Sequence, residues 1–229
     1  MTAGRIEKRY ARIYKPLLFA ACIVPFLLAT VGVLAQSGLL PPSWSRFGAD
    51  LGVDPVRRVL GIFGKTTLNL LLLTLAVTPL RQLTGNAHLL RLRRMLGVFA
   101  FFYALMHFIT YVGPFQGFSW SAIVADIVKR PYITLGFTAL LMLLPLAITS
   151  TNGMMRRLKG RWQKLHRLIY AIAVLGVWHY WWQVKKDIRE PLIYAAILAG
   201  LLGWRLWRRR RRSPTSRSAP PTAPGKTAA

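Results

Sequence analysis

Acidic residues are scarce in this 229-residue sequence, which has 6 Asp and Glu against 32 Lys and Arg. Cysteine is scarcer still, because Cys22 is the only one. A single thiol excludes an intramolecular disulfide, a CxxC redox pair and a cysteine-ligated cluster. The long apolar runs of the sequence contain no carboxylate. They therefore lack most of the ligands that a zinc site with four N, S or O donors would need.

Apolar length is what the sequence has in abundance. Hydrophobic residues make up 54% of the chain, and the basic residues lie mainly between the apolar runs. A basic nucleic-acid-binding protein would interleave charge and polar faces on amphipathic elements, so this pattern indicates a polytopic membrane protein. Backbone amides must be paired within lipid, which favours helices. We predict an all-α fold with six transmembrane helices, over Pro16–Ala35, Thr66–Leu80, Leu96–Gly113, Pro131–Thr149, Leu168–Val184 and Pro191–Trp207.

The distribution of basic residues orients these predicted helices. There are 23 Lys and Arg in the two tails and in the connections after helices two and four, where Arg205 is counted with the second tail. The other connections hold 9. The positive-inside rule then predicts that both termini are cytoplasmic. Residues 1–15 would form a basic tail, 16–207 the membrane domain, and 208–229 a disordered basic tail that lies against anionic lipid. Alternatively, residues 1–35 are a cleaved signal peptide, although their apolar run is long for one.

Two histidines lie inside the predicted membrane helices, His107 in the third and His179 in the fifth. Each is 11 residues beyond the start of its apolar run, and both helices run from the inside to the outside. At 1.5 Å per residue, both imidazoles lie roughly 16 Å into a core about 30 Å thick. Histidines in membrane helices are costly and usually mark function. Two imidazoles at one depth on different helices favour axial ligation of a heme iron.

Other interpretations of the histidines stay open. Each of the pair can instead bond a backbone carbonyl or a hydroxyl on a neighbouring helix, or serve a proton relay in a heme-free transporter. His166 lies 13 residues before His179, which places it at the cytoplasmic edge of the same predicted helix and about 140° around it. His88 falls in a predicted loop, where we interpret it as a solvated surface residue.

A series of motifs in order resembles one known family. From about Leu51 to Trp207 the sequence is similar to the heme-binding membrane subunits of bacterial periplasmic protein-methionine-sulfoxide reductase systems, the MsrQ or YedZ family, within the wider ferric-reductase-like transmembrane group. No single motif would suffice. The motifs are VDPVRRVLGIFGKT (53–66), TPLR (78–81), RLRRMLG (91–97), LMHFITY (105–111), RPYITLG (130–136) and TSTNGMMRRLKGRWQKLHRLIY (149–170), followed by His179 and Tyr180.

The resemblance implies heme b and a set of axial ligands. The wider group carries two histidine pairs, one pair each on helices three and five, which clamp two stacked hemes. Here helix five keeps both histidines, His166 and His179, whereas helix three keeps only His107, and Arg93 or Arg94 stands where the inner partner is expected. We therefore expect an outer heme held by His107 and His179. A second, inner heme would need His166 alone or another ligand.

The resemblance also implies a route for electrons. Ferric reductases continue into a cytoplasmic flavin- and nicotinamide-binding domain, for which residues 208–229 are too few. We expect electrons to come from the quinone pool or a soluble flavin reductase, with FMN as a cofactor implied by resemblance alone. They would leave to MsrP, a periplasmic molybdopterin reductase that repairs oxidised methionine in envelope proteins. The chain would then be an electron-transfer subunit of the bacterial inner membrane. A stand-alone cytochrome b that reduces ferric iron or quinone is the alternative.

Residues around the predicted sites have two interpretations each. Inner basic residues, Arg93 and Arg94 among them, are candidates for binding heme propionates, a flavin phosphate or a donor protein, or they only set topology and bind lipid headgroups. Aromatic residues either pack a porphyrin or form an interfacial belt; they are Tyr103, Tyr111, Trp178, Trp181 and Trp182. Outer carboxylates either dock a periplasmic partner or only reflect topology; they are Asp50, Asp54, Asp126, Asp187 and Glu190.

Overall fold

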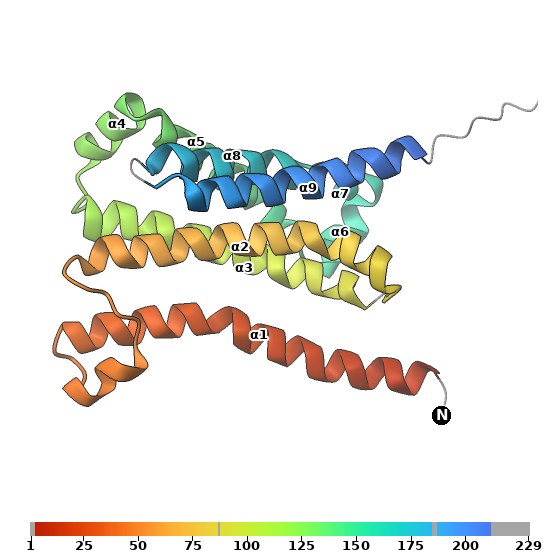
Figure 1. The fold of residues 1–229 in the computed structure, drawn as a ribbon, viewed down its shortest axis with the longest axis horizontal. Coiled ribbons are helices and arrows are strands. Elements are labelled where there is room, and N and C mark those ends of the chain that lie inside the picture. The colour runs from red at the N-terminus through yellow and green to blue at the C-terminus, as the bar shows by residue number, and fades with distance from the viewer. Residues whose placement is uncertain (1–2, 87, 185–186, 212–229) are drawn as a thin grey trace, which may run out of the picture.

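The computed structural model describes residues 3–86, 88–184 and 187–211, and every regular element in them is a helix. This confirms the all-α prediction. The long helices run roughly along one direction, with short helices at the two ends (Figure 1). The prediction of a disordered tail over 208–229 is wrong for residues 208–211, which continue α9; from residue 212 on, the tail lies outside the described residues. The elements are α1 Ala3–Gln36, η1 Pro42–Phe47, α2 Pro55–Thr84, α3 Leu89–Thr110, the π-helical turn η2 Tyr111–Phe115, α4 Trp120–Lys129, α5 Pro131–Ile148, α6 Asn152–Leu158, α7 Gly160–Leu165, α8 Leu168–Gln183 and α9 Arg189–Arg211.

Among the described residues, four stretches of helix are long and apolar enough to cross a membrane, where six spans were predicted. They are Ile13–Gln36 in α1, Pro55–Thr84 (α2), Leu89–Phe115 (α3 with η2) and Pro131–Ile148 (α5). The fifth and sixth predicted spans correspond to α8 and α9. Helix α8 has only 16 residues. Helix α9 has 23 residues, but Arg205 interrupts its apolar part and its last turn is basic.

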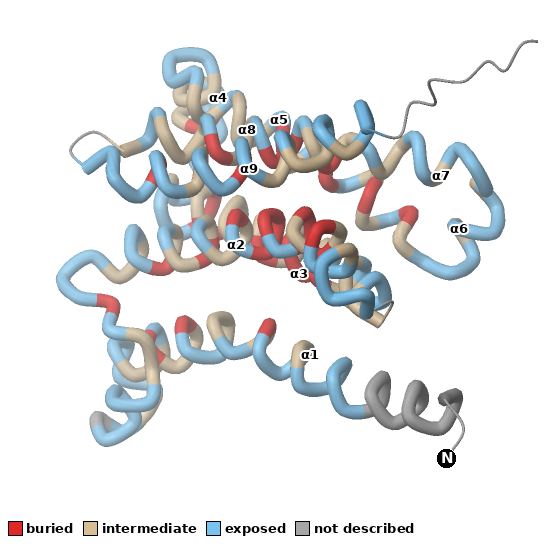
Figure 2. Tube along the Cα trace, turned by 45° about the vertical axis from the view of Figure 1, so that its right-hand side comes forward, coloured by how far each residue is buried: buried red, intermediate tan, exposed pale blue. Residues whose placement is uncertain are grey.

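The core of the bundle is built from two helix pairs. Helix α2 packs along α3, and α5 packs along α8, more extensively than any other elements do. Helix α9 contacts both α2 and α8 and so joins the two pairs. Leu75 of α2 and Ile172 of α8 are fully buried in the core. Buried residues concentrate on α2 and α3, whereas residues 13–36 of α1 are mostly exposed or intermediate (Figure 2).

Tyr103 attaches α1 to the rest of the bundle. Its hydroxyl donates to the carbonyl of Cys22 at 2.6 Å and accepts from the amide of Phe26 at 3.1 Å. These two backbone groups are four residues apart, so they are the pair that an α-helical hydrogen bond would join. The Tyr103 hydroxyl is therefore inserted into the backbone hydrogen-bond ladder of α1. It lies beside Pro25, which has no amide hydrogen to donate. A tyrosine with no exposed surface thus fixes α1 on α3.

Asp54 and Pro55 start α2 as the sequence predicts. The Asp54 carboxylate accepts a hydrogen bond from the amide of Arg57 at 3.0 Å, and Pro55 occupies the first turn. By its sequence, the Asp54–Pro55 pair is expected to begin a separate short amphipathic helix before the second predicted span, and this expectation is wrong because α2 continues without a break to Thr84. Gly85 then ends the helix in the left-handed region, with φ 69°.

The predicted fifth span begins at Leu168, as α8 does, but the helix does not extend back to His166. Helix α7 ends at Leu165 and α8 begins at Leu168, so His166 caps α7 and lies in the turn between them. The prediction that His166 and His179 share one continuous helix is therefore wrong. Their angular separation of about 140°, which assumed a straight helix, does not apply. His166 belongs to the short-helix layer formed by α6 and α7.

Candidate functional site

The structure brings the rings of His107 and His179 together. His107 lies near the end of α3 and His179 near the end of α8, on the two helix pairs. Their ring centroids are 6.2 Å apart and their planes are almost perpendicular, at 87°. Both residues are half-buried. We call this part of the bundle, which includes α4 and the start of α9, the paired-histidine end, and the opposite part, with α6 and α7, the basic end (Figure 1).

A backbone carbonyl orients each ring of the pair. His107 Nδ1 lies 2.9 Å from the carbonyl oxygen of Leu60 on α2, and His179 Nδ1 lies 2.6 Å from that of Tyr132 on α5. A carbonyl can only accept, so each Nδ1 carries the hydrogen and donates it. In a neutral imidazole this leaves the Nε2 lone pair available. Metal-ligating histidines commonly make this same second hydrogen bond, which fixes the tautomer and the ring orientation.

A glycine makes room for each ring. A Cβ added to Gly64 would lie 3.1 Å from His107 Nδ1, and a Cβ added to Gly136 would lie 2.8 Å from His179 Nδ1. Real Cβ atoms are rarely so close to another heavy atom. Gly64 follows Leu60, and Gly136 follows Tyr132, by four residues. One helix turn therefore presents both the carbonyl that accepts the hydrogen bond and the gap beside it.

The two halves of the site repeat the same spacing. His107 follows Leu60 by 47 residues, and His179 follows Tyr132 by 47 residues. The pair α2–α3 and the pair α5–α8 therefore supply equivalent units, each with a carbonyl, a glycine and an imidazole. Sequence analysis missed Leu60, Gly64, Tyr132 and Gly136. The equal spacing from each glycine to its histidine was the signal that could have found them.

The donor set fits a heme iron with two axial imidazoles. A metal about 2.0 Å from each nitrogen, with each nitrogen roughly 1.1 Å from its ring centre, separates two ring centroids by about 6 Å. The observed separation is 6.2 Å. Within the described residues, no three His, Cys, Asp or Glu side chains come together as a metal site. Two protein nitrogens are nevertheless sufficient for heme, because the porphyrin supplies the other four donors.

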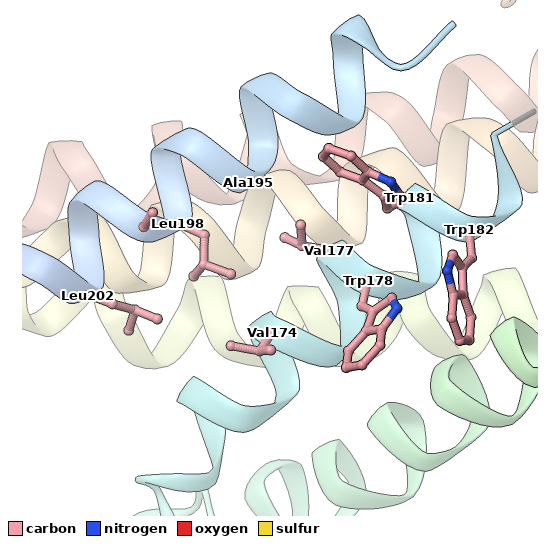
Figure 3. Close-up of a pocket in the computed structure, with 9 residues that line it drawn as sticks. Val174, Val177, Trp178, Trp181, Trp182, Ala195, Leu198 and Leu202 are labelled. Atoms are coloured by element: carbon pink, nitrogen blue, oxygen red, sulfur yellow. The ribbon is translucent and has the colours of Figure 1, made fainter. Parts of the chain in front are cut away.

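The predicted aromatic residues point in several directions. Tyr103 bonds α1, and the Tyr111 hydroxyl donates to Asp126 at 3.2 Å. Tyr132, which was not predicted, has its ring centroid 6.1 Å from that of His179. The three tryptophans instead line an apolar cavity of about 450 Å³ between α8 and α9 (Figure 3). No histidine lines that cavity, so it is separate from the imidazole pair.

His166 is held differently from the pair. Its ring stacks on Trp162 with centroids 3.9 Å apart, and its Nδ1 lies 3.1 Å from the Trp162 carbonyl oxygen. Its Nε2 is buried without a hydrogen-bond partner. Burial lowers the pKa of His166, the Trp162 carbonyl opposes this, and the charge of Arg93 lowers the pKa further. Within the described residues, no second imidazole stacks on His166, and a cation from α3 lies near it instead.

Two other residues of the basic end, Arg94 and His88, are engaged within the chain. Arg94 Nη1 donates to the side chain of Asn152 at the start of α6. His88, predicted to be solvated, is half-buried, with a buried Nδ1 that has no hydrogen-bond partner. Its backbone amide donates to Asn86 at 2.9 Å. His88 therefore belongs to the packed start of α3 rather than to a free loop.

The acidic side chains that the structure describes all lie at the paired-histidine end. Glu190 accepts from Lys65 at 2.5 Å and from the Tyr180 hydroxyl. These hydrogen bonds, the one from Lys65 first, lower the pKa of Glu190. Asp126 pairs with Arg130 at 3.1 Å and accepts from Gln116. Two of the outer carboxylates, which were interpreted either as docking a partner or as reflecting topology, are thus engaged within the chain.

Comparison with known proteins gives consistent results. A family model described as "Ferric reductase like transmembrane component" matches residues 60–177. A protein of Xanthomonas campestris pv. campestris (strain 8004) is 59% identical over 180 residues, which cover 77% of this chain and 82% of that protein. A protein of Rhodospirillum rubrum is 48% identical over 219 residues, which cover 93% of this chain and 98% of that protein. Both relatives are named "Protein-methionine-sulfoxide reductase heme-binding subunit MsrQ".

Proposed function

Since this chain belongs to the ferric-reductase-like transmembrane family, and within it to the heme-binding subunits of methionine-sulfoxide reductases, we propose that it binds heme b through His107 and His179 and relays electrons across a membrane. The observation that carries this proposal is the pair of facing imidazoles, each with its Nδ1 hydrogen committed to a carbonyl. Bound between them, heme b would supply reversible one-electron transfer.

The residues of the chain have distinct tasks in this function. The Nε2 atoms of His107 and His179 would bind the heme iron. The carbonyls of Leu60 and Tyr132 keep each ring in the tautomer that leaves Nε2 free. Gly64 and Gly136 let the rings lie directly against α2 and α5. This arrangement presets both ligands on rigid helices, so little reorganisation is needed when the cofactor binds.

We further propose six spans, with α8 and α9 completing the bundle and both termini in the cytoplasm of a bacterial inner membrane. The positive charge supports this orientation, because the basic end holds α6, α7 and the arginines at the end of α9. Electrons would enter there from the quinone pool or a flavin reductase, with FMN as a candidate cofactor. They would leave from the paired-histidine end to a periplasmic molybdopterin reductase of the MsrP type. The domain would extend over 16–207, with basic tails at 1–15 and 208–229.

A reduced-minus-oxidised absorption spectrum of the purified protein tests the heme assignment. We expect a b-type signal in the wild type that is lost in His107→Ala and in His179→Ala. His166→Ala should keep the signal of the outer heme, because His166 lies at the opposite end. A wild-type protein that stays free of heme when it is expressed with heme precursor would contradict the proposal. Full retention of the b-type signal in both His107→Ala and His179→Ala would also contradict the proposal.

Orientation can be tested with the single cysteine of the chain. In a Cys22→Ser background, a cysteine introduced at Lys159, between α6 and α7, should be shielded from a membrane-impermeant maleimide in intact cells. A cysteine introduced at Trp120, an exposed residue at the start of α4, should react. The reverse labelling pattern would invert the proposed topology.

A further inference from the structure

The carboxylate of Asp126, in the last turn of α4, joins segments from the two helix pairs. Its Oδ2 accepts hydrogen bonds from the Gln116 side chain at 2.5 Å and from the Tyr111 hydroxyl at 3.2 Å. Its Oδ1 lies 3.1 Å from Nε of Arg130. Tyr111 and Gln116 belong to the turn that continues α3, whereas Arg130 directly precedes α5. Asp126 therefore connects α3 and α5 at the paired-histidine end, where α4 lies (Figure 1).

On one side, this connection leads to His107. Tyr111 follows His107 by four residues, and its backbone amide donates to the His107 carbonyl. The chain changes there from the α-helical α3 to the π-helical turn η2, and such single turns are frequent at functional sites. The ring of Tyr111 also stacks on that of Phe115, with centroids 6.0 Å apart. The hydrogen bond from Tyr111 to Asp126 therefore restrains the helix turn that follows His107.

On the other side, the connection leads to His179. Nη1 of Arg130 donates to the Tyr132 hydroxyl at 3.4 Å. Tyr132 is the residue whose carbonyl oxygen lies 2.6 Å from His179 Nδ1, and its ring centroid lies 6.1 Å from that of His179. Asp126 thus holds Arg130 in contact with the residue that orients the second imidazole.

The aspartate at the equivalent position of the other half has a different role. Asp54 lies six residues before Leu60, and Asp126 lies six residues before Tyr132. Asp54 caps α2 and pairs with Arg57 of the same turn, and its side chain is 56% exposed. The Asp126 side chain is only 15% exposed, and a shielded carboxylate with charge-assisted hydrogen bonds is held more firmly than an exposed one. One half therefore uses its aspartate as a helix cap, whereas the other uses it to connect helices.

We propose that Asp126 is a positioning residue of the heme site, which acts on His107 through Tyr111 and on His179 through Arg130 and Tyr132. The inference rests on the proposed function, because it concerns a heme held between the two imidazoles. Asp126 sets the angle between the imidazoles by restraining the segments that carry and orient them. It also balances the charge of Arg130 beside the cofactor.

Charge variants of the full-length protein test the second task by redox titration. A ferric heme carries one more positive charge than a ferrous heme, so an unbalanced cation nearby favours reduction and an unbalanced anion favours oxidation. Asp126→Asn leaves Arg130 unbalanced, and the midpoint potential should rise. Arg130→Gln leaves Asp126 unbalanced, and the potential should fall. A purely structural defect that admits water to the site would shift both variants in the same direction.

Asp54→Asn is the matched control for the titration. Asp54 occupies the equivalent position in the other half, and solvent screens its exposed charge. Asparagine also remains a good helix cap. The midpoint potential of this variant should therefore equal that of the wild type.

The orientation of the imidazoles gives a second measurement. The low-spin EPR signal of a ferric heme with two imidazole ligands depends on the angle between the ring planes, which is 87° here. Asp126→Ala removes the acceptor for Tyr111 and Arg130, so its EPR signal should differ from that of the wild type. Its heme should also transfer to apomyoglobin about three- to tenfold faster, because buried donors lose their acceptor. Asp126→Asn still offers an oxygen to Tyr111 and should keep most of the wild-type EPR signal.

The inference is overturned if Asp126→Asn and Arg130→Gln shift the potential in the same direction, or no further than Asp54→Asn does. An EPR signal of Asp126→Ala identical to that of the wild type overturns it as well. Should the Asp126 variants fail to fold, Arg130→Lys decides, because it keeps the charge. It should restore the wild-type potential, and a potential equal to that of Arg130→Gln refutes the role of Asp126.

The wild-type spectrum separates this inference from the proposed function. A b-type signal in the wild type without the opposite shifts refutes the positioning role of Asp126 and leaves the electron relay intact. A wild type that binds no heme refutes both.

Discussion

At the paired-histidine end, α3 and α8 each contribute an imidazole, and the rings face each other with centroids 6.2 Å apart. At the basic end, His166 precedes α8, and α3 contributes Arg93, whose charge acts on that histidine. The same pair of helices thus makes a symmetric site at one end and an asymmetric site at the other. One end brings two imidazoles together, whereas the other places a single imidazole under the influence of a cation.

The difference extends to the surroundings of each imidazole. His107 and His179 each have a carbonyl on a neighbouring helix and a glycine beside the ring. His166 Nδ1 instead donates to a carbonyl of its own short helix, that of Trp162, and the Trp162 ring stacks on the imidazole. A site preset by neighbouring helices is more rigid than one set by a local turn. We therefore expect the two ends to respond differently to mutation.

The largest effect should come from filling a glycine gap at the paired-histidine end. In Gly136→Ala, the new methyl group would lie 2.8 Å from His179 Nδ1 and must displace the ring from its carbonyl partner. Overpacking of this kind costs about 1–3 kcal/mol, so we expect at least half of the bound heme to be lost. Gly64→Ala, with its contact at 3.1 Å, should lose less. Heme per protein, measured by the pyridine hemochrome assay, checks both variants.

Gly97→Ala is the control for that experiment, because a Cβ there meets nothing within 4 Å. Alanine favours a helix over glycine by up to about 1 kcal/mol, so this variant should keep its heme and be at least as stable. Equal heme content in Gly136→Ala and Gly97→Ala would show that the ring does not need the gap.

A histidine on α3 at the basic end should reduce the asymmetry between the ends. Arg93→His removes the charge that opposes His166 and supplies a second imidazole. We expect the heme-to-protein ratio to rise toward one additional heme, with a second potential in a redox titration. Arg94→His is the comparison, because Arg94 bonds Asn152 instead, and it should add less. An unchanged ratio in Arg93→His would mean that the missing ligand alone does not explain the asymmetry.

The basic end should also show a modest dependence on pH. Burial lowers the pKa of His166 from an unfolded value of about 6.5, so the unfolded chain binds the proton more readily. Its neutral form therefore gives full stability above about pH 6.5, and stability falls as the pH drops below that value. His166→Gln, which cannot titrate, should flatten the decline in melting temperature between pH 7 and 5. If the melting temperature of His166→Gln declines as steeply with falling pH as that of the wild type, His166 is not the source of the pH dependence.

The smallest effect should come from the exposed pair of Lys65 and Glu190. Both side chains are about half exposed, at 46% and 53%, so Glu190→Gln should cost no more than about 0.5–1 kcal/mol. The lowered pKa of Glu190 means that this contribution is present above its unfolded pKa and is lost as the pH falls through the folded one. Melting curves at pH 7 and 4 check the sign. A loss larger than that of Gly136→Ala would reverse the ranking of the two sites.

Much of the fold was readable from the pattern of apolar runs, caps and prolines. The all-α class, the start of α2 at Asp54 and Pro55, and the matched depth of His107 and His179 all depend on local spacing. The turn between α7 and α8 was missed because neither His166 nor Arg167 is a helix breaker, although the apolar run itself was predicted to begin at Leu168, where α8 begins. Helix α4 was missed because its ten residues are too few for a membrane span.

The sequence by itself determined the all-α class and the helices that are long and apolar enough to cross a membrane, because both depend on local composition, and it predicted two imidazoles at matching positions of two helices. Only the tertiary structure decided what surrounds them. Whether a carbonyl of Leu60 meets His107, whether Gly136 is open to His179, and whether Asp126 reaches Tyr111 depend on helix rotation and crossing. Those are set by packing between segments far apart in the chain, which no local pattern of residues encodes.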